Sequence, residues 1–186
     1  QDLINFLKDY PSDTIARRVF WEIDTQKLNP SELIEYEQCK EYIDKYEKYV
    51  CLGQSVRHPF YKDQDWVKET KEVSFLMDFK IENNKIILNE KDPEVINYRK
   101  SVHLLDFVLT KEEELLIGMK HYWMTNSAKF VRGAGRLIIS KEGDVEYIDN
   151  HSGHYPSCPE QFDLALNIIS DKIHIKNIHK LDYGYT

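Results

Sequence analysis

The chain has 186 residues, and its 25 Lys and Arg against 32 Asp and Glu give a formal net charge of −7 with the seven His neutral. A hydrophobic content of 41% at this length is enough to bury the core of one domain, or of one domain with a small appendage. The acidic balance excludes a nonspecific nucleic-acid binder, which needs a basic stripe, and no apolar run approaches the ~20 residues that span a bilayer.

The first fifty residues are predicted to be helical. A first helix places Ile15, Val19 and Ile23 on one face at a spacing of four residues. A second helix is better marked, because Asn29 can cap it and Glu32 stands at the capping-box position. An apolar, tyrosine-rich stripe continues along this second helix: Tyr36, Cys39, Ile43, Tyr46 and Val50.

The hydrophobic pattern then changes from a helical period to a period of two. A hairpin is predicted from residues 73–81 and 86–88, and a short helix begins at Asp92. Because the later connections are short, the strands that follow are expected to be antiparallel neighbours. These strands are His103–Thr110, Leu115–Trp123, Arg136–Ser140 and Val145–Asp149.

The last helix has a clear start, since Ser157 and Glu160 form a capping-box pair. A final strand or tail covers Ile173–Thr186. Together these elements predict an α+β fold, an antiparallel β-meander or curved sheet with N-terminal helices and a C-terminal helix. Residues 1–50 are expected to form a helical region packed on a main α+β domain of residues 51–186. The apolar face of the last helix consists of Phe162, Leu166 and Ile169.

The segment 149–156, between the last predicted strand of the sheet and the last helix, carries most of the candidate chemistry. Ser152, His154 and Tyr155 place a hydroxyl, an imidazole and a phenol within four residues. Gly153 lets the backbone approach a ligand closely. The same residues also suit a strand-to-helix corner, in which polar side chains bond the backbone to fix the turn.

A metal site is not favoured in this segment. His151, His154 and Cys158 have a spacing that a soft divalent ion can use, but no second ligand pair accompanies them, and structural zinc needs four ligands. No metal or cofactor is therefore expected. The chain has only three scattered cysteines, too few for a disulfide scaffold, which favours folding inside a cell.

A second segment, Thr125–Arg136, contains a Gly-Ala-Gly run and two arginines. It lacks the pattern of a phosphate loop and lies between predicted strands, so its glycines indicate a bulge or a crowded crossing in the sheet. Arg132 and Arg136 remain candidate anchors for phosphate or carboxylate, because a guanidinium group binds both through two parallel hydrogen bonds.

Several short sequences between His103 and Ile169 occur in a definite order and spacing. They are Phe107-Val108-Leu109-Thr110, Leu115-Leu116-Ile117-Gly118, Ala134-Gly135-Arg136-Leu137, Gly143, Ser152-Gly153-His154-Tyr155, Glu160 and Phe162. This pattern resembles the C-terminal domain of the plant IQ-motif-containing calmodulin-binding protein family. It also resembles related bacterial domains at the ends of toxin-associated or effector-like proteins. The resemblance covers about a third of the chain.

The chain departs from the family pattern in three places. Asn126–Phe130 stands where family members carry a His-Ser-Ser-Phe-like run, so a function that depends on that run does not carry over. Family members have no His at the position of His151, which adds to the argument against a metal. The helix that binds calmodulin in the family has no counterpart in this sequence, and calmodulin binding is therefore not expected.

We expect a soluble recognition domain of effector, toxin-associated or accessory type, with neither nucleic acid nor membrane as its partner. Its expected ligand is small and anionic, for example a nucleotide, because helix N-termini and arginines both favour negative charge. The expected location is the cytoplasm, or the host-cell cytosol if the protein is a delivered effector. The expected ligand-binding residues are Ser127, Arg132, Arg136, Asn150, Ser152, Gly153, His154 and Tyr155.

Two alternatives remain open. In the first, the protein is a transferase or hydrolase in which His154 acts as general acid or base and is assisted by Ser152 and Tyr155. In the second, it is an acidic antagonist of the immunity type, which binds a protein partner through the tyrosine-rich helix around Glu35 and Asp44.

Overall fold

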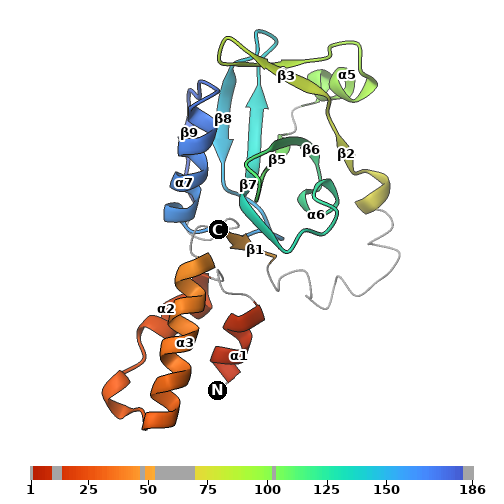
Figure 1. The fold of residues 1–186 in the computed structure, drawn as a ribbon. Helices are drawn as coiled ribbons and strands as arrows, with labels where there is room; N and C mark the ends of the chain where they lie inside the picture. Colours follow the sequence, from red (N-terminus) through yellow and green to blue (C-terminus); the bar gives the residue numbers. More distant parts are fainter. Residues whose placement is uncertain (1, 10–13, 47–48, 53–69, 102–103, 182–186) are drawn as a thin grey trace.

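The computed structural model describes residues 2–9, 14–46, 49–52, 70–101 and 104–181. The predicted α+β class is confirmed: the chain forms a seven-stranded mixed sheet, a separate two-stranded hairpin, and helices at both ends (Figure 1). Within the described ranges no helix combines the length and the apolar character needed to cross a membrane.

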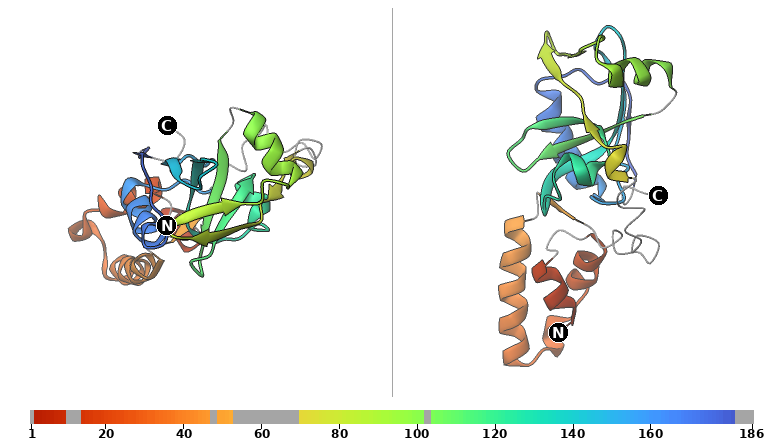
Figure 2. Two further views of the ribbon diagram at one scale, coloured as in Figure 1. Left: turned by 90° about the horizontal axis from the view of Figure 1, so that it is seen from above. Right: turned by 90° about the vertical axis from the view of Figure 1, so that its right-hand side faces the viewer.

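Within the described residues the N-terminal part contains three α-helices, α1 (Asp2–Asp9), α2 (Thr14–Trp21) and α3 (Pro30–Tyr46), and a short 3-10 helix at Thr25–Lys27. The predicted capping box of α3 is present. The Glu32 N–H donates to Asn29 Oδ1 at 2.8 Å, and the Asn29 N–H donates to the Glu32 carboxylate at 3.1 Å. Figures 1 and 2 show these helices at one end of the molecule, away from most of the sheet. They enclose a core of their own, made of Leu7, Ala16, Phe20, Tyr36, Cys39 and Ile43.

The apolar face predicted for the first helix is wrong in part. Val19 is 49% exposed, whereas Phe20 is buried and stacks on Tyr36 with 4.5 Å between ring centroids. The helix ends at Trp21, before Ile23, and a helix this short takes its inward side from tertiary contacts rather than from its period. The stripe predicted for α3 is confirmed by the burial of Tyr36, Cys39 and Ile43. Val50, predicted to continue it, lies beyond the end of the helix in a short strand. The side chains of Ile15 and Tyr46 lie outside the described part of the chain.

The strands of the main sheet are β1 (Val50–Cys51), β2 (Phe75–Leu76), β5 (Leu105–Thr110), β6 (Leu115–Met119), β7 (Phe130–Ile139), β8 (Val145–Asp149) and β9 (Ile178–His179). Their order is β2-β6-β5-β7-β8-β9, with β1 paired to the start of β7. The predicted antiparallel pairing is confirmed for β5 with β6 and for β7 with β8. The strands β8 and β9 are parallel, because α7 (Pro159–Ser170) lies between them as a crossover. A simple meander would place β7 beside β6. Here β6 and β7 lie on opposite sides of β5, and α6 (His121–Met124) lies in the connection between them.

Two strands have bounds that differ from the prediction. The strand predicted to reach Trp123 ends four residues earlier, because Lys120 has a φ of 71° and the chain turns there into α6. The strand predicted to begin at Arg136 begins at Phe130, so the Gly-Ala-Gly run lies inside β7. Of the predicted final strand, β9 is formed within the described residues, and residues 182–186 lie outside them.

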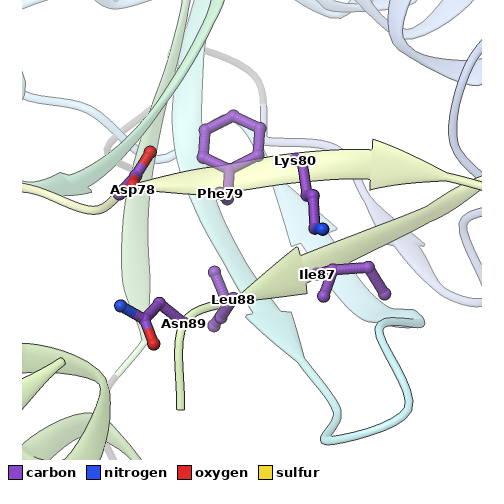
Figure 3. Close-up of a pocket in the computed structure, with 6 residues that line it drawn as sticks. All are labelled: Asp78, Phe79, Lys80, Ile87, Leu88 and Asn89. Atoms are coloured by element: carbon purple, nitrogen blue, oxygen red, sulfur yellow. The ribbon is translucent and has the colours of Figure 1, made fainter. Parts of the chain in front are cut away.

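The predicted hairpin is present as β3 (Phe79–Glu82) and β4 (Lys85–Leu88). Its predicted first arm, residues 73–81, is wrong in part, because Phe75–Leu76 form β2 and pair with β6 of the main sheet. The two asparagines of its turn have positive φ, the conformation that tight hairpin turns require. Beyond the hairpin, α5 (Pro93–Lys100) begins with Asp92 as its cap, as predicted. A hollow of about 330 Å³ lies on the hairpin, between side chains of both strands (Figure 3).

The start of α7 lies one residue after the predicted position. Cys158 is the cap residue, and its N–H donates to the side chain of Gln161 at 3.2 Å, whereas Ser157 is buried before the helix and does not pair with Glu160. The apolar face predicted for this helix is confirmed by the burial of Phe162, Leu166 and Ile169.

The two faces of the main sheet are covered differently. Phe107 of β5 belongs to the large core that includes Phe162 of α7. Its neighbour Val108 belongs to a second core, with Met124 of α6 and Tyr155. Because successive residues of a strand point to opposite faces, Asp106 also lies on the face away from α7.

Candidate functional site

Three charged residues lie side by side on the sheet face away from α7. Asp106 on β5 is the register partner of Arg136 on β7, and Arg136 is the partner of Asp149 on β8. Directly paired residues of neighbouring strands point to the same face. We call Asp106, Arg136 and Asp149 the polar row.

Asp149 is fully buried and accepts hydrogen bonds from three residues. Arg136 donates its backbone N–H at 3.0 Å and its Nη2 at 2.8 Å. The Tyr147 hydroxyl and the His151 N–H donate at 2.7 and 2.9 Å. Burial acts to raise the pKa of Asp149, but these donors outweigh it and hold the pKa below its ordinary value. The carboxylate therefore stays charged and fixes the Arg136 guanidinium, whose side chain is 33% exposed.

Close approach of two strands makes this pairing possible. A Cβ on Gly135 would lie 1.8 Å from the backbone oxygen of Asp149, so only glycine lets β7 and β8 come together beside Arg136. The expected crowded crossing at the Gly-Ala-Gly run is thus confirmed at this position.

His121, at the start of α6, connects the polar row to the Ser-Gly-His-Tyr loop. Its Nε2 lies 2.7 Å from the Gly135 carbonyl oxygen and 3.8 Å from Asp106 Oδ1. Because a carbonyl only accepts, Nε2 carries a proton and donates to it, while Nδ1 lies 3.3 Å from the Ser152 hydroxyl oxygen. Ser152 Oγ accepts in turn from the Tyr155 N–H at 3.1 Å. Ser152 is 1% exposed and serves this internal network.

His154 lies nearer the surface than Ser152. Its ring packs on Tyr122, with 5.2 Å between centroids and 30° between planes. Burial, followed by the charges of His121 and Lys120, lowers the pKa of His154 to about 4. The imidazole is therefore neutral at pH 7. The adjacent Gly153 is exposed, and no described atom lies within 4 Å of the place its Cβ would take.

The shifted pKa of His154 predicts a pH-dependent stability. The unfolded chain, with an ordinary His pKa of 6.5, binds the proton more tightly than the fold does. The lowered pKa of His154 therefore makes the free energy of unfolding depend on pH. The contribution of His154 is fully present above pH 6.5 and is lost as the pH falls toward about 4. We expect urea unfolding curves to show this decline. The variant His154→Gln should show a shallower decline that does not vanish, because the pKa of His151 is also lowered. An identical decline in both proteins would contradict this role of His154.

Tyr155 bonds to the turn after α6, and Ser127 lies on the same turn. Tyr155 is fully buried, and its hydroxyl donates to the Ala128 oxygen at 2.7 Å and lies 2.8 Å from Thr125 Oγ1. Burial raises its pKa to about 12. Ser127 is exposed on this turn, with a φ of 66° and its N–H donating to the Tyr122 oxygen. Tyr155 thus supports the turn rather than facing solvent.

Two expected binding residues lie away from the polar row. Asn150 is fully buried, and its side chain accepts from the Leu181 N–H at 2.7 Å and donates to the Leu181 oxygen at 2.9 Å, which ties the end of the chain to the sheet. Arg132 donates to the Lys111 oxygen at 3.1 Å, pairs with Glu113 at 3.4 Å and lies over the Tyr49 ring.

The structure therefore divides the residues expected from sequence. It connects Ser152 to the polar row through His121 and Asp106, two residues that the sequence pattern did not indicate, and it places His154 on Tyr122. A signal for Asp106 was present, since it is the one charged residue of its strand. Nothing local marks His121, because the segment containing it is predicted to be a strand.

Metal ligation finds no support in the described ranges, which contain no cluster of three or more His, Cys, Asp or Glu able to hold an ion. Cys158 is the buried cap of α7, and burial raises the pKa of its thiol.

Comparison of the chain with protein-family models, curated proteins and solved structures gives no match, so no relative adds to the geometry of this site.

Proposed function

We propose that this protein is a recognition domain that binds a small anionic ligand beside the Ser-Gly-His-Tyr loop. The observation that carries the proposal is the state of Arg136. One edge of its guanidinium is held by the buried Asp149, while its Nη1 has no hydrogen-bond partner among the described residues. An arginine fixed in this way can donate its remaining N–H groups to a phosphate or carboxylate with little loss of side-chain entropy.

The charges around Arg136 are balanced, so an anion can bind there although the chain as a whole is acidic. Near the loop, Arg136 and Lys120 carry two positive charges and Asp106 and Asp149 carry two negative ones, so the local charge is 2 − 2 = 0 against −7 for the whole chain. The anion thus meets no net repulsion from these four groups.

A ligand with a planar ring is favoured by the imidazole of His154. The ring is neutral at pH 7, is already packed on Tyr122, and is next to the open side of Gly153. Aromatic side chains of this kind stack well on a heteroaromatic base. A nucleotide combines such a ring with an anionic group, which agrees with the ligand class expected from sequence.

The enzyme alternative is supported less well. A His with a pKa of about 4 is a weak base at pH 7 and is almost never protonated there, so His154 is poorly suited to general acid or base work. Ser152 and Tyr155 are 1% and 0% exposed, and both are engaged in internal hydrogen bonds.

Calorimetric titration with AMP tests this proposal, with inorganic phosphate as the ligand that lacks a ring. We expect wild type to bind AMP more tightly than phosphate. The variant Arg136→Lys should weaken AMP binding about tenfold or more, because it loses the paired donor geometry. Arg132→Lys, on the same strand but away from the polar row, is the matched control and should bind as wild type does.

Absence of AMP binding by folded wild type, or equal binding by Arg136→Lys, would overturn the proposal. Consumption of AMP during the titration would favour the enzyme alternative instead.

A further inference from the structure

Another cavity lies beside the turn that follows α6. Its volume is about 400 Å³, and it is lined by the end of β5 with the turn after it, by residues 124–128, and by the start of β7. Small-molecule sites commonly have volumes of about 300–1,000 Å³. The lining includes Lys111 and Lys129, and we call this cavity the lysine pocket.

Neither lysine of this pocket is neutralised. The Lys111 Nζ lies 5.5 Å from the centre of the Tyr49 ring, and the Lys129 Nζ lies 5.5 Å from that of the Phe130 ring. No carboxylate forms an ion pair with either one among the described residues. With Glu112 as the acidic residue of the lining, the charge is 2 − 1 = +1.

This charge distinguishes the lysine pocket from two other hollows of the same protein. The hairpin hollow of Figure 3 has Asp78 and Lys80 in its lining, which sum to zero. A groove of about 230 Å³ beside α7 is lined by two glutamates and one lysine, which give 1 − 2 = −1. In a chain of net charge −7, a cavity with excess positive charge is a local reversal that favours an anion.

The rest of the lining is largely apolar. Leu116, Ala128 and Phe130 are half-buried and form part of the pocket wall, so they offer apolar surface that the apolar body of a ligand can cover. Thr125 adds a hydroxyl that is bonded to Tyr155. An inorganic ion would leave this apolar surface uncovered, whereas an amphipathic molecule would cover it.

We propose that the lysine pocket is a second binding site, for a small amphipathic organic anion in which a carboxylate, sulfonate or phosphate is joined to an apolar or aromatic body. The anionic group is placed between Lys111 and Lys129, and the body lies against Leu116, Ala128 and Phe130. Tyr155 holds the wall of this pocket through Ala128 and Thr125, so the Ser-Gly-His-Tyr loop supports both sites.

Fluorescence titration with 8-anilino-1-naphthalenesulfonate, an aromatic sulfonate, tests this proposal. We expect the double variant Lys111→Gln/Lys129→Gln to raise the dissociation constant about tenfold or more, because two charge-assisted contacts are lost. A neutral naphthylamine probe should bind both proteins equally. The matched control is Lys80→Gln/Lys141→Gln, which removes the same charge from the hairpin and from an exposed turn.

Equal binding of the sulfonate by wild type and the Lys111/Lys129 variant would overturn the proposal, as would an equal loss in the control variant. A circular dichroism melt establishes that the variant is folded. The variant Arg136→Lys should leave sulfonate binding unchanged, so failure of this site and failure of the AMP site are distinguishable.

Discussion

Replacement of Asp149 by Ala is expected to destabilise the protein by about 3–5 kcal/mol, because breaking a buried ion pair leaves the other charge without a partner. In this protein Arg136, Tyr147 and the His151 N–H all lose their acceptor at once. A loss of this size is a large part of the ~5–15 kcal/mol that stabilises a typical domain. Urea unfolding at neutral pH measures it directly.

An exposed ion pair provides the control. Asp163 pairs with Lys180 at 2.5 Å, but their side chains are 50% and 44% exposed. Asp163→Ala should therefore cost less than ~1 kcal/mol. Asp149→Asn keeps an acceptor oxygen and should fall between the two. If Asp149→Ala unfolded at the same urea concentration as Asp163→Ala, the polar row would not be the organising element that we describe.

Replacement of Gly135 by Ala is expected to cost about 3 kcal/mol or more, at or above the top of the usual range for overpacking. The added Cβ would meet the backbone oxygen of Asp149, which cannot rotate away as a side chain can. The strands β7 and β8 must separate, and the contact between Arg136 and Asp149 lengthens with them. We expect both a lower urea midpoint and weaker AMP binding.

Gly153→Ala is the matched control for this substitution. Gly153 has no positive φ and no described atom near its Cβ position, so stability should change by less than ~0.5 kcal/mol. Equal destabilisation by the two substitutions would contradict the close strand approach at Gly135. Reduced AMP binding by Gly153→Ala without loss of stability would place the ligand beside this glycine.

Much of the fold follows from local sequence signals. The capping box of α3, the Asn-Asn hairpin turn and the antiparallel pairing of β5 with β6 depend on residues close together in the chain. The predicted bounds of strands are wrong where contacts between residues far apart in the chain determine where a strand ends. Lys120 ends β6 because its N–H donates to Asp106, a partner that local patterning does not indicate.

The candidate site is less accessible to sequence reasoning, because strand register creates it. The segment 149–156 is identified from its composition, but the pairing of Arg136 with Asp149 depends on how β7 and β8 align. The two arginines expected to anchor an anion, Arg136 and Arg132, each have a carboxylate partner. Lys111 and Lys129 have no carboxylate partner among the residues the structure describes.

An NMR titration with AMP tests the central claim most directly, since it locates the ligand without relying on a substitution. The Arg136 side chain has a single Nε–H, whose signal reports on the guanidinium, and the amides of Gly153 and His154 report on the loop. We predict that these three signals shift together and saturate at one AMP concentration. Saturating shifts confined to other parts of the sheet, or no shift at these three positions, would contradict ligand recognition beside the Ser-Gly-His-Tyr loop.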